Sequence, residues 1–113
     1  MSTTVVVDID DSPDNMLLVE RLVIARGCQM LKAINGSTGI ELALEHNPQI
    51  ILLDINLPDI DGYEVARRLR DNPQTATIPI VAVTANALKG DAEKAIAAGC
   101  DGFIKRAGGV ERL

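Results

Sequence analysis

The sequence predicts an α/β fold, a doubly wound sheet of five parallel strands with helices on both faces. Short apolar runs alternate with segments of helical periodicity from one end of the chain to the other. Apolar residues make up 47% of the chain and are almost all aliphatic, a composition typical of buried parallel strands. The 113 residues carry neither a repeat nor a linker, so a single domain over residues 1–113 is expected.

Five short apolar runs are the expected strands, at residues 4–9, 30–34, 49–53, 80–83 and 102–104. Because strands and helices alternate, right-handed crossovers should join the strands into one parallel sheet.

The first expected helix has clear end signals. It begins at Ser12 and Pro13, an N-cap residue followed by a proline suited to the first helical position, and ends at Gly27. Its apolar residues are expected to form one buried face. These residues are Leu17, Leu18, Leu22 and Val23.

Three further helices are expected at about residues 37–47, 61–72 and 89–98. In the second of these, Asp61 and Glu64 have the spacing of a capping box. A helix should also follow the last strand, but only residues 108–113 remain for it, so this last helix is expected to be truncated or missing.

Composition excludes several kinds of partner. The formal charge of −5, without a cluster of Lys and Arg, argues against a nucleic-acid surface. No apolar run is long enough to span a bilayer and no signal peptide begins the chain, so a cytoplasmic protein is expected. Cys28 and Cys100 lack metal-ligand spacing and are expected to be free thiols.

Acidic side chains follow two of the expected strands. Asp10 and Asp11 come after the first strand and Asp54 after the third, and in parallel sheets such strand ends form ligand sites. Three carboxylates brought together would repel one another, and a hard cation such as Mg²⁺ would relieve the repulsion. Asp54 could then attack phosphorus as a nucleophile. Thr84, at the end of the fourth strand, would offer a hydroxyl to a phosphoryl oxygen.

These segments resemble the receiver domains of two-component response regulators. The resemblance is carried by residues 10–15 (DDSPDN), 53–64 (LDINLPDIDGYE), 78–85 (IPIVAVTA) and 98–103 (AGCDGF). It implies a flavodoxin-like sheet of strand order 2-1-3-4-5 and a signalling domain that is no enzyme beyond slow self-dephosphorylation. The whole of the second segment matches the phosphoacceptor loop of that family, which makes it the most specific part of the resemblance.

The resemblance also implies residue roles and partners. Asp10, Asp11, Asp54 and the main-chain carbonyl of Asn56 would hold Mg²⁺, and a sensor histidine kinase or phosphotransfer protein would phosphorylate Asp54. Thr84 and Phe103 would be the switch residues, and a downstream protein would read the surface that results.

Three features depart from the family pattern. The usual Lys-Pro after the fifth strand is absent, and either Lys105 or Arg106 would replace the lysine that contacts phosphate. Asp8 lies inside the first strand, where it would be neutral, joined to the metal cluster, or exposed by a shifted or frayed strand. Without a last helix one face of the sheet is left uncovered, and a homodimer could form through it.

Two other functions fit parts of the sequence. A docking module could keep the receiver fold without phosphorylation, as the altered Lys-Pro region suggests. A phosphatase of the haloacid-dehalogenase type could instead use Asp8 as nucleophile and Asp10 as general acid, but this alternative leaves the loop around Asp54 unexplained.

Overall fold

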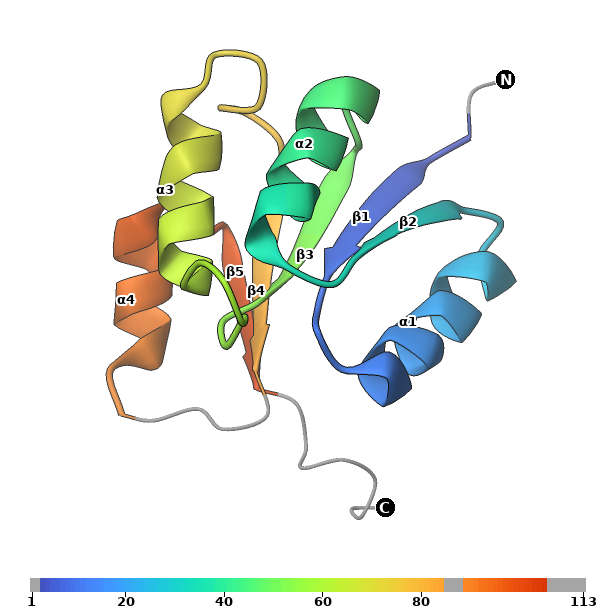
Figure 1. Cartoon of the computed structure of the whole chain (residues 1–113), viewed down its shortest axis with the longest axis horizontal. Helices are drawn as coiled ribbons and strands as arrows, with labels where there is room; N and C mark the ends of the chain where they lie inside the picture. The colour runs from blue at the N-terminus through green and yellow to red at the C-terminus, as the bar shows by residue number, and fades with distance from the viewer. Residues whose placement is uncertain (1–2, 85–88, 106–113) are drawn as a thin grey trace.

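The computed structural model of the chain describes residues 3–84 and 89–105, and within them a five-stranded parallel sheet of order β2-β1-β3-β4-β5 (Figure 1). The predicted fold and strand order are confirmed. The strands are β1 (Val5–Ile9), β2 (Gln29–Ala33), β3 (Ile50–Asp54), β4 (Ile80–Thr84) and β5 (Gly102–Lys105). The helices are α1 (Pro13–Ala25), α2 (Gly36–His46), α3 (Gly62–Asp71) and α4 (Asp91–Ala98).

The main core lies between the sheet and helices α2, α3 and α4. Alternate strand residues point into this core, as in β3, where Ile51 and Leu53 are fully buried. Leu69 and Ala66 of α3 meet them from the helical side. Helix α1 packs on the opposite face, against β1 and β2 (Figure 1).

Helix α1 corrects one sequence-based expectation. Its buried residue is Met16, whereas Leu17, Leu18 and Leu22 are 48%, 55% and 57% exposed. Within the described residues, α1 is the one helix on its face of the sheet, so its leucines have no neighbouring helix to pack against. The predicted apolar face is therefore wrong except for the half-buried Val23.

The helix ends bear out some of the capping predictions. Ser12 caps α1 by accepting a hydrogen bond from the Asn15 amide at 3.3 Å. Asp61 caps α3 by accepting from the amide of Tyr63 at 2.7 Å. The predicted capping box is wrong, because the Glu64 carboxylate forms ion pairs along the exposed surface with the next turn of the helix instead. Its partners are Arg67 and Arg68.

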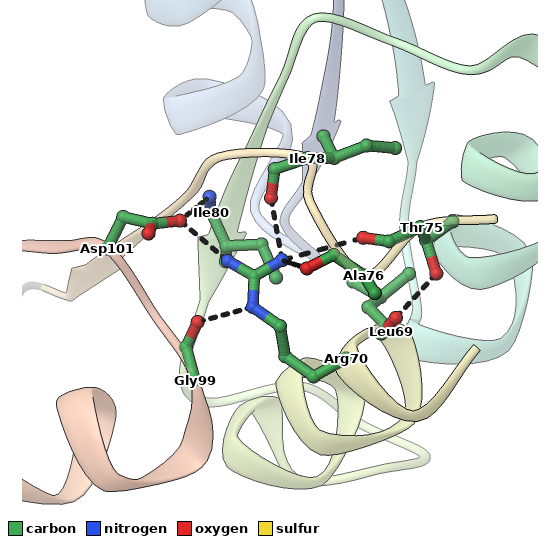
Figure 2. A network of polar contacts seen from close by, with 8 residues as sticks. All are labelled: Leu69, Arg70, Thr75, Ala76, Ile78, Ile80, Gly99 and Asp101. Atoms are coloured by element: carbon green, nitrogen blue, oxygen red, sulfur yellow. Dashed lines mark hydrogen bonds and ion pairs between the residues drawn. The ribbon is translucent and has the colours of Figure 1, made fainter. Parts of the chain in front are cut away.

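Arg70, at the end of α3, links this helix to the segment before β4 and to the turn between α4 and β5 (Figure 2). These contacts lie at the edge of the sheet opposite the acidic residues. Its guanidinium donates to the main-chain oxygens of Gly99 at 2.8 Å and Ile78 at 2.7 Å. It also pairs with Asp101 at 2.6 Å, and the same Asp101 oxygen accepts from the Ile80 amide at 2.9 Å. Arginine suits this role because its fixed fork of five N–H groups can serve several acceptors at once.

The expected last helix and Arg106 lie outside the described residues. Cys28 and Cys100 are free thiols, as expected, and Cys100 is buried. Among the described helices, none has the length and apolar character needed to cross a membrane.

Candidate functional site

The three acidic residues predicted to converge lie together at the carboxyl edge of the sheet. Asp10 directly follows β1 and Asp54 ends β3, and these two strands are paired, with Ile9 opposite Leu53. Each of Asp10, Asp11 and Asp54 offers a carboxylate oxygen, and these oxygens all lie within 4.8 Å of one another. Asp10 is buried, Asp54 is half-buried and Asp11 is exposed, so the cluster opens to solvent on one side.

The turn after β1 holds Asp10 in place. Its amide donates to the Ala33 carbonyl of β2 at 2.9 Å, which extends the strand pairing by one residue. One of its carboxylate oxygens accepts from the Ser12 amide at 2.9 Å, directly before α1 begins. The position of Asp10 is thus fixed by two neighbouring elements.

The pKa of Asp54 reflects the electrostatic environment of the cluster. Burial raises the pKa of this carboxyl to about 6, and the negative charges of Asp10 and Asp11 act in the same direction. The amide of Asn56, which donates to Asp54 at 3.1 Å, opposes this shift. A cation bound beside these three acids would stabilise the ionised form of Asp54.

The loop between β3 and α3 folds back tightly on the end of β3. The Gly62 amide donates to the Ile55 carbonyl at 3.0 Å. A Cβ atom at Gly62 would lie 2.6 Å from the Asp54 carbonyl oxygen and 2.6 Å from the Ile55 Cα, so only glycine allows this approach. Asn56, whose carbonyl was predicted as a metal ligand, lies in this loop two residues from Asp54.

The donor set fits Mg²⁺ better than other common metals. Three carboxylates, with room for a main-chain carbonyl and water, are the hard oxygen ligands that Mg²⁺ takes in proteins. No histidine or cysteine belongs to the cluster, which makes the site unlike those of zinc.

Among the predicted phosphate-contacting residues, Thr84 and Lys105 are in the described part of the chain and lie at the ends of β4 and β5. Thr84 is buried at the last position of β4 and is paired with Lys105. Asp54, Val83 and Ile104 are paired across three strands and share one face, which leaves Lys105 on the other face by strand alternation. Within the described residues, no ion pair joins Lys105 to the acidic cluster.

Phe103 is half-buried against the main core, next to Ala82 of β4. It therefore lies on the same face of β5 as Lys105.

Asp8 lies in the middle of the sheet, between Lys32 of β2 and Leu52 of β3, and is only 3% exposed. The prediction of a shifted or frayed strand is therefore wrong. Asp8 does not belong to the acidic cluster either. Its burial within β1 also argues against the phosphatase alternative, which needs Asp8 accessible as a nucleophile.

Asp59 takes part in the architecture of the site, a role that its place in the sequence does not indicate. Its carboxylate accepts hydrogen bonds from the Gly36 amide at 2.7 Å and from the Ser37 amide at 3.0 Å. These bonds, with the Ser37 hydroxyl, hold the pKa of Asp59 well below its usual range. The contact joins residues more than twenty positions apart, so no local motif could have predicted it.

A family model of the response regulator receiver domain matches residues 6–113. The chain belongs to the response regulator receiver domain family. It therefore belongs to a family of signalling domains of two-component systems, whose members interact with a histidine kinase or phosphotransfer partner.

Individual receiver-domain proteins support the same assignment. The polar-differentiation response regulator DivK of Brucella anthropi is 39% identical over 105 residues, which cover 93% of this chain and 85% of that protein. The receiver domain of the sensor histidine kinase PA1611 from Pseudomonas aeruginosa PAO1 is 28% identical, with a TM-score of 0.86 over 94% of this chain and 87% of that one. Its crystal structure has a magnesium ion coordinated in the active-site cleft.

A third structure, the chemotaxis protein CheY4 of Vibrio cholerae, is similar in fold. It is 22% identical, with a TM-score of 0.87 over 94% of this chain and 88% of that one.

Proposed function

We propose that this receiver domain accepts a phosphoryl group on Asp54 in a Mg²⁺-dependent reaction, with a sensor histidine kinase or phosphotransfer protein as donor. The observation that carries the proposal is the convergence of the Asp10, Asp11 and Asp54 carboxylates within 4.8 Å at an edge open to solvent. Mg²⁺ held by these residues and the Asn56 carbonyl would neutralise charge on the phosphoryl oxygens.

In the proposed step, a carboxylate oxygen of Asp54 attacks the phosphorus of a phosphohistidine. The new bond joins that oxygen to phosphorus, and the phosphorus–nitrogen bond breaks. The imidazole leaves with the electron pair and takes up a proton. Because its pKa is about 6, Asp54 is mostly ionised at neutral pH and available as the nucleophile.

Residues at the ends of β4 and β5 would respond to the new group. The Thr84 hydroxyl would donate to a phosphoryl oxygen, and Phe103 would follow it as the second switch residue. Either Lys105, which is paired with Thr84, or Arg106 would supply the cation that binds phosphate. A downstream protein would then read the altered surface.

The proposed site of action is the cytoplasm, where a cytoplasmic phosphodonor domain could reach Asp54. The two free thiols, Cys28 and Cys100, suit a reducing compartment.

The direct test is intact mass or Phos-tag electrophoresis after treatment with acetyl phosphate. With Mg²⁺ present, the wild type should gain one phosphoryl group, and chelation of the metal should prevent the gain. Asp54→Ala should remain unmodified, whereas Asp14→Ala should behave as wild type. Asp14 is a suitable control because it is an exposed acid of α1 outside the cluster.

A docking module without phosphorylation would give a different set of results. Because some receiver domains do not accept acetyl phosphate, a purified phosphodonor kinase and beryllofluoride, a mimic of the acyl phosphate, complete the test. If the kinase transfers nothing, and Mg²⁺ with beryllofluoride leaves the amide resonances around Asp54 unmoved, the phosphoacceptor proposal is wrong.

We further propose that two copies of the domain associate through the face of the sheet that carries α1. Leu18 and Leu22 of α1 and Ile104 of β5 are each more than half exposed on this face. Sedimentation analysis should show a concentration-dependent dimer that Leu22→Gln weakens; a monomer at all concentrations would refute it.

A further inference from the structure

The loop after Asp54 is tied to a distant helix. Both carboxylate oxygens of Asp59 are used: one accepts from the Gly36 amide at 2.7 Å, and the other from the Ser37 amide at 3.0 Å and the Ser37 hydroxyl at 2.8 Å. Gly36 and Ser37 are the first two residues of α2. A loop residue thus completes the N-terminus of a helix that it follows by more than twenty residues.

Helix α2 does not depend on Asp59 alone for its start. Its N-cap, Asn35, accepts from the Thr38 amide at 2.9 Å through its side chain and from the Gly39 amide at 3.2 Å through its carbonyl. Of the first-turn amides that lack a partner within the helix, those of Gly36 and Ser37 therefore donate to Asp59, and that of Thr38 donates to the Asn35 side chain. Asn35 caps α2 from its own segment, whereas Asp59 also connects α2 to the loop beside the acidic cluster.

These bonds form one path between the two halves of the cluster. The Asp10 amide donates to the Ala33 carbonyl at the end of β2, and two residues later Asn35 begins the cap of α2. The first residues of α2 bind Asp59, which lies in the same loop as Asn56, and this loop begins directly after Asp54 at the end of β3. The β1 side and the β3 side of the cluster are thus joined through α2 as well as through the sheet.

The surroundings of Gly36 show how closely the loop and the helix meet. A Cβ atom at Gly36 would lie 2.7 Å from the Val65 side chain, 3.2 Å from Ile60 Cβ and 3.3 Å from the Asp59 carboxylate. The absence of a side chain lets the loop approach the helix amides directly. A longer side chain at residue 36 would separate the two.

We propose that Asp59 is a positioning residue of the phosphoacceptor site, whose contact with α2 holds the β3–α3 loop so that Asn56 and Asp54 keep the spacing that Mg²⁺ requires. The inference rests on the proposed function, because it needs the acidic cluster to bind Mg²⁺. Residues that orient metal ligands without touching the metal commonly matter for affinity.

The test compares two ways of weakening the start of α2. Asp59→Ala removes the cap and the loop contact, whereas Asn35→Ala removes a cap and leaves the loop contact in place. Both variants should unfold at a lower temperature than wild type. Mg²⁺ affinity, measured by isothermal titration with MgCl₂, should fall about tenfold in Asp59→Ala, the lower end of such effects. It should stay at the wild-type value in Asn35→Ala.

Asp59→Asn provides a second variant, because its amide keeps one acceptor oxygen without the charge. The Mg²⁺ affinity of Asp59→Asn should lie between those of wild type and Asp59→Ala. Should the alanine variant fail to fold, Asp59→Asn takes its place in the comparison. Amide resonances of residues 55–58 should shift in the Asp59 variants and not in Asn35→Ala.

The possible results separate the two proposals. Equal Mg²⁺ affinity in wild type, Asn35→Ala and the Asp59 variants would overturn the positioning role and leave the phosphoacceptor site intact. Equal losses in the Asn35 and Asp59 variants would also overturn it, since a cap alone would then explain the effect. Absence of Mg²⁺ binding in wild type would refute both the metal site and the role of Asp59.

Discussion

The protonation of Asp54 links the chemistry of the site to the stability of the fold. Burial and the neighbouring acids raise its pKa from 3.8 to about 6 in the folded protein. The folded state therefore binds this proton more tightly than the unfolded state does. As a result, ionised Asp54 destabilises the metal-free protein, and Mg²⁺ should reverse the effect by favouring the carboxylate.

We expect this to appear in urea unfolding of the metal-free protein at different pH values. The contribution of Asp54 to the free energy of unfolding should decrease as pH rises from about 4 to about 6 and then level off. Asp54→Asn should lack this contribution and unfold a few degrees above wild type at pH 7.5, roughly the effect of a small gain in a domain of this size.

The comparison with Asp54→Asn is needed because Asp59 and Glu64 change the free energy of unfolding with pH in the opposite direction to Asp54. Hydrogen bonds lower the pKa of both, so their contributions are lost as pH falls below about 4.5. A difference between wild type and Asp54→Asn that does not depend on pH would contradict the assignment.

At the level of single residues, the sequence was sufficient to predict site residues whose location depends on their position along a strand. Asp10, Asp11 and Asp54 were identified because acids that follow neighbouring parallel strands meet at one edge, and they do. Asp59 was not identified, since its partners are determined by how a loop packs on a distant helix. The burial of Asp8 was likewise decided by neighbouring strands and not by its own segment.

Among the elements, the β3–α3 loop is the most constrained, and Gly62 is its tightest point. Gly62→Ala would place a methyl group 2.6 Å from backbone atoms of Asp54 and Ile55, which cannot move aside as a flexible side chain can. We expect a loss of about 1–3 kcal/mol in the free energy of unfolding, the usual range for overpacking. Phosphorylation of Asp54 should fall as well, because the loop would be displaced from β3.

Gly102→Ala is a matched control for this variant. Its nearest neighbours would be Val81 methyl groups at 3.7 and 3.8 Å, an ordinary contact distance. If Gly62→Ala unfolded at the same urea concentration as Gly102→Ala, the described loop geometry would be incorrect.

The sequence predicted where the helices and strands lie, but not which face of helix α1 contacts the sheet. Strand and helix positions agree with expectation to within about two residues at most ends, the usual uncertainty of boundaries. The face of α1 was predicted wrongly because a helical pattern identifies apolar residues without showing which of them meets the sheet. In α1 the buried positions are Met16 and, in part, Val19 and Val23.

In the molecule as a whole, the Arg70 network connects elements that are separate in sequence. The Arg70 side chain is 21% exposed and bonds to Ile78, Gly99 and Asp101 (Figure 2). Arg70→Met would remove the guanidinium donor from all three, although the Asp101 oxygen would keep its bond from the Ile80 amide. We expect a loss of about 2–3 kcal/mol in the free energy of unfolding, as for hydrogen bonds that involve a charged group.

Arg67→Met is the control, since Arg67 is on the same helix and forms one exposed ion pair with Glu64. Urea unfolding should show a change within about 0.5 kcal/mol for this variant. Equal losses in the two variants would mean that the Arg70 network adds no more than a surface pair.

The position of this network also shows how α4 is held. Arg70 bonds to the chain at Gly99 and Asp101, directly after α4 ends at Ala98, so the last turn of α4 is tied to the end of α3. At the other end of α4, the Tyr63 hydroxyl in the first turn of α3 donates to the Asp91 carboxylate at 2.9 Å. Because polar contacts join the two helices at both ends, a displacement of α4 against the sheet should carry α3 with it.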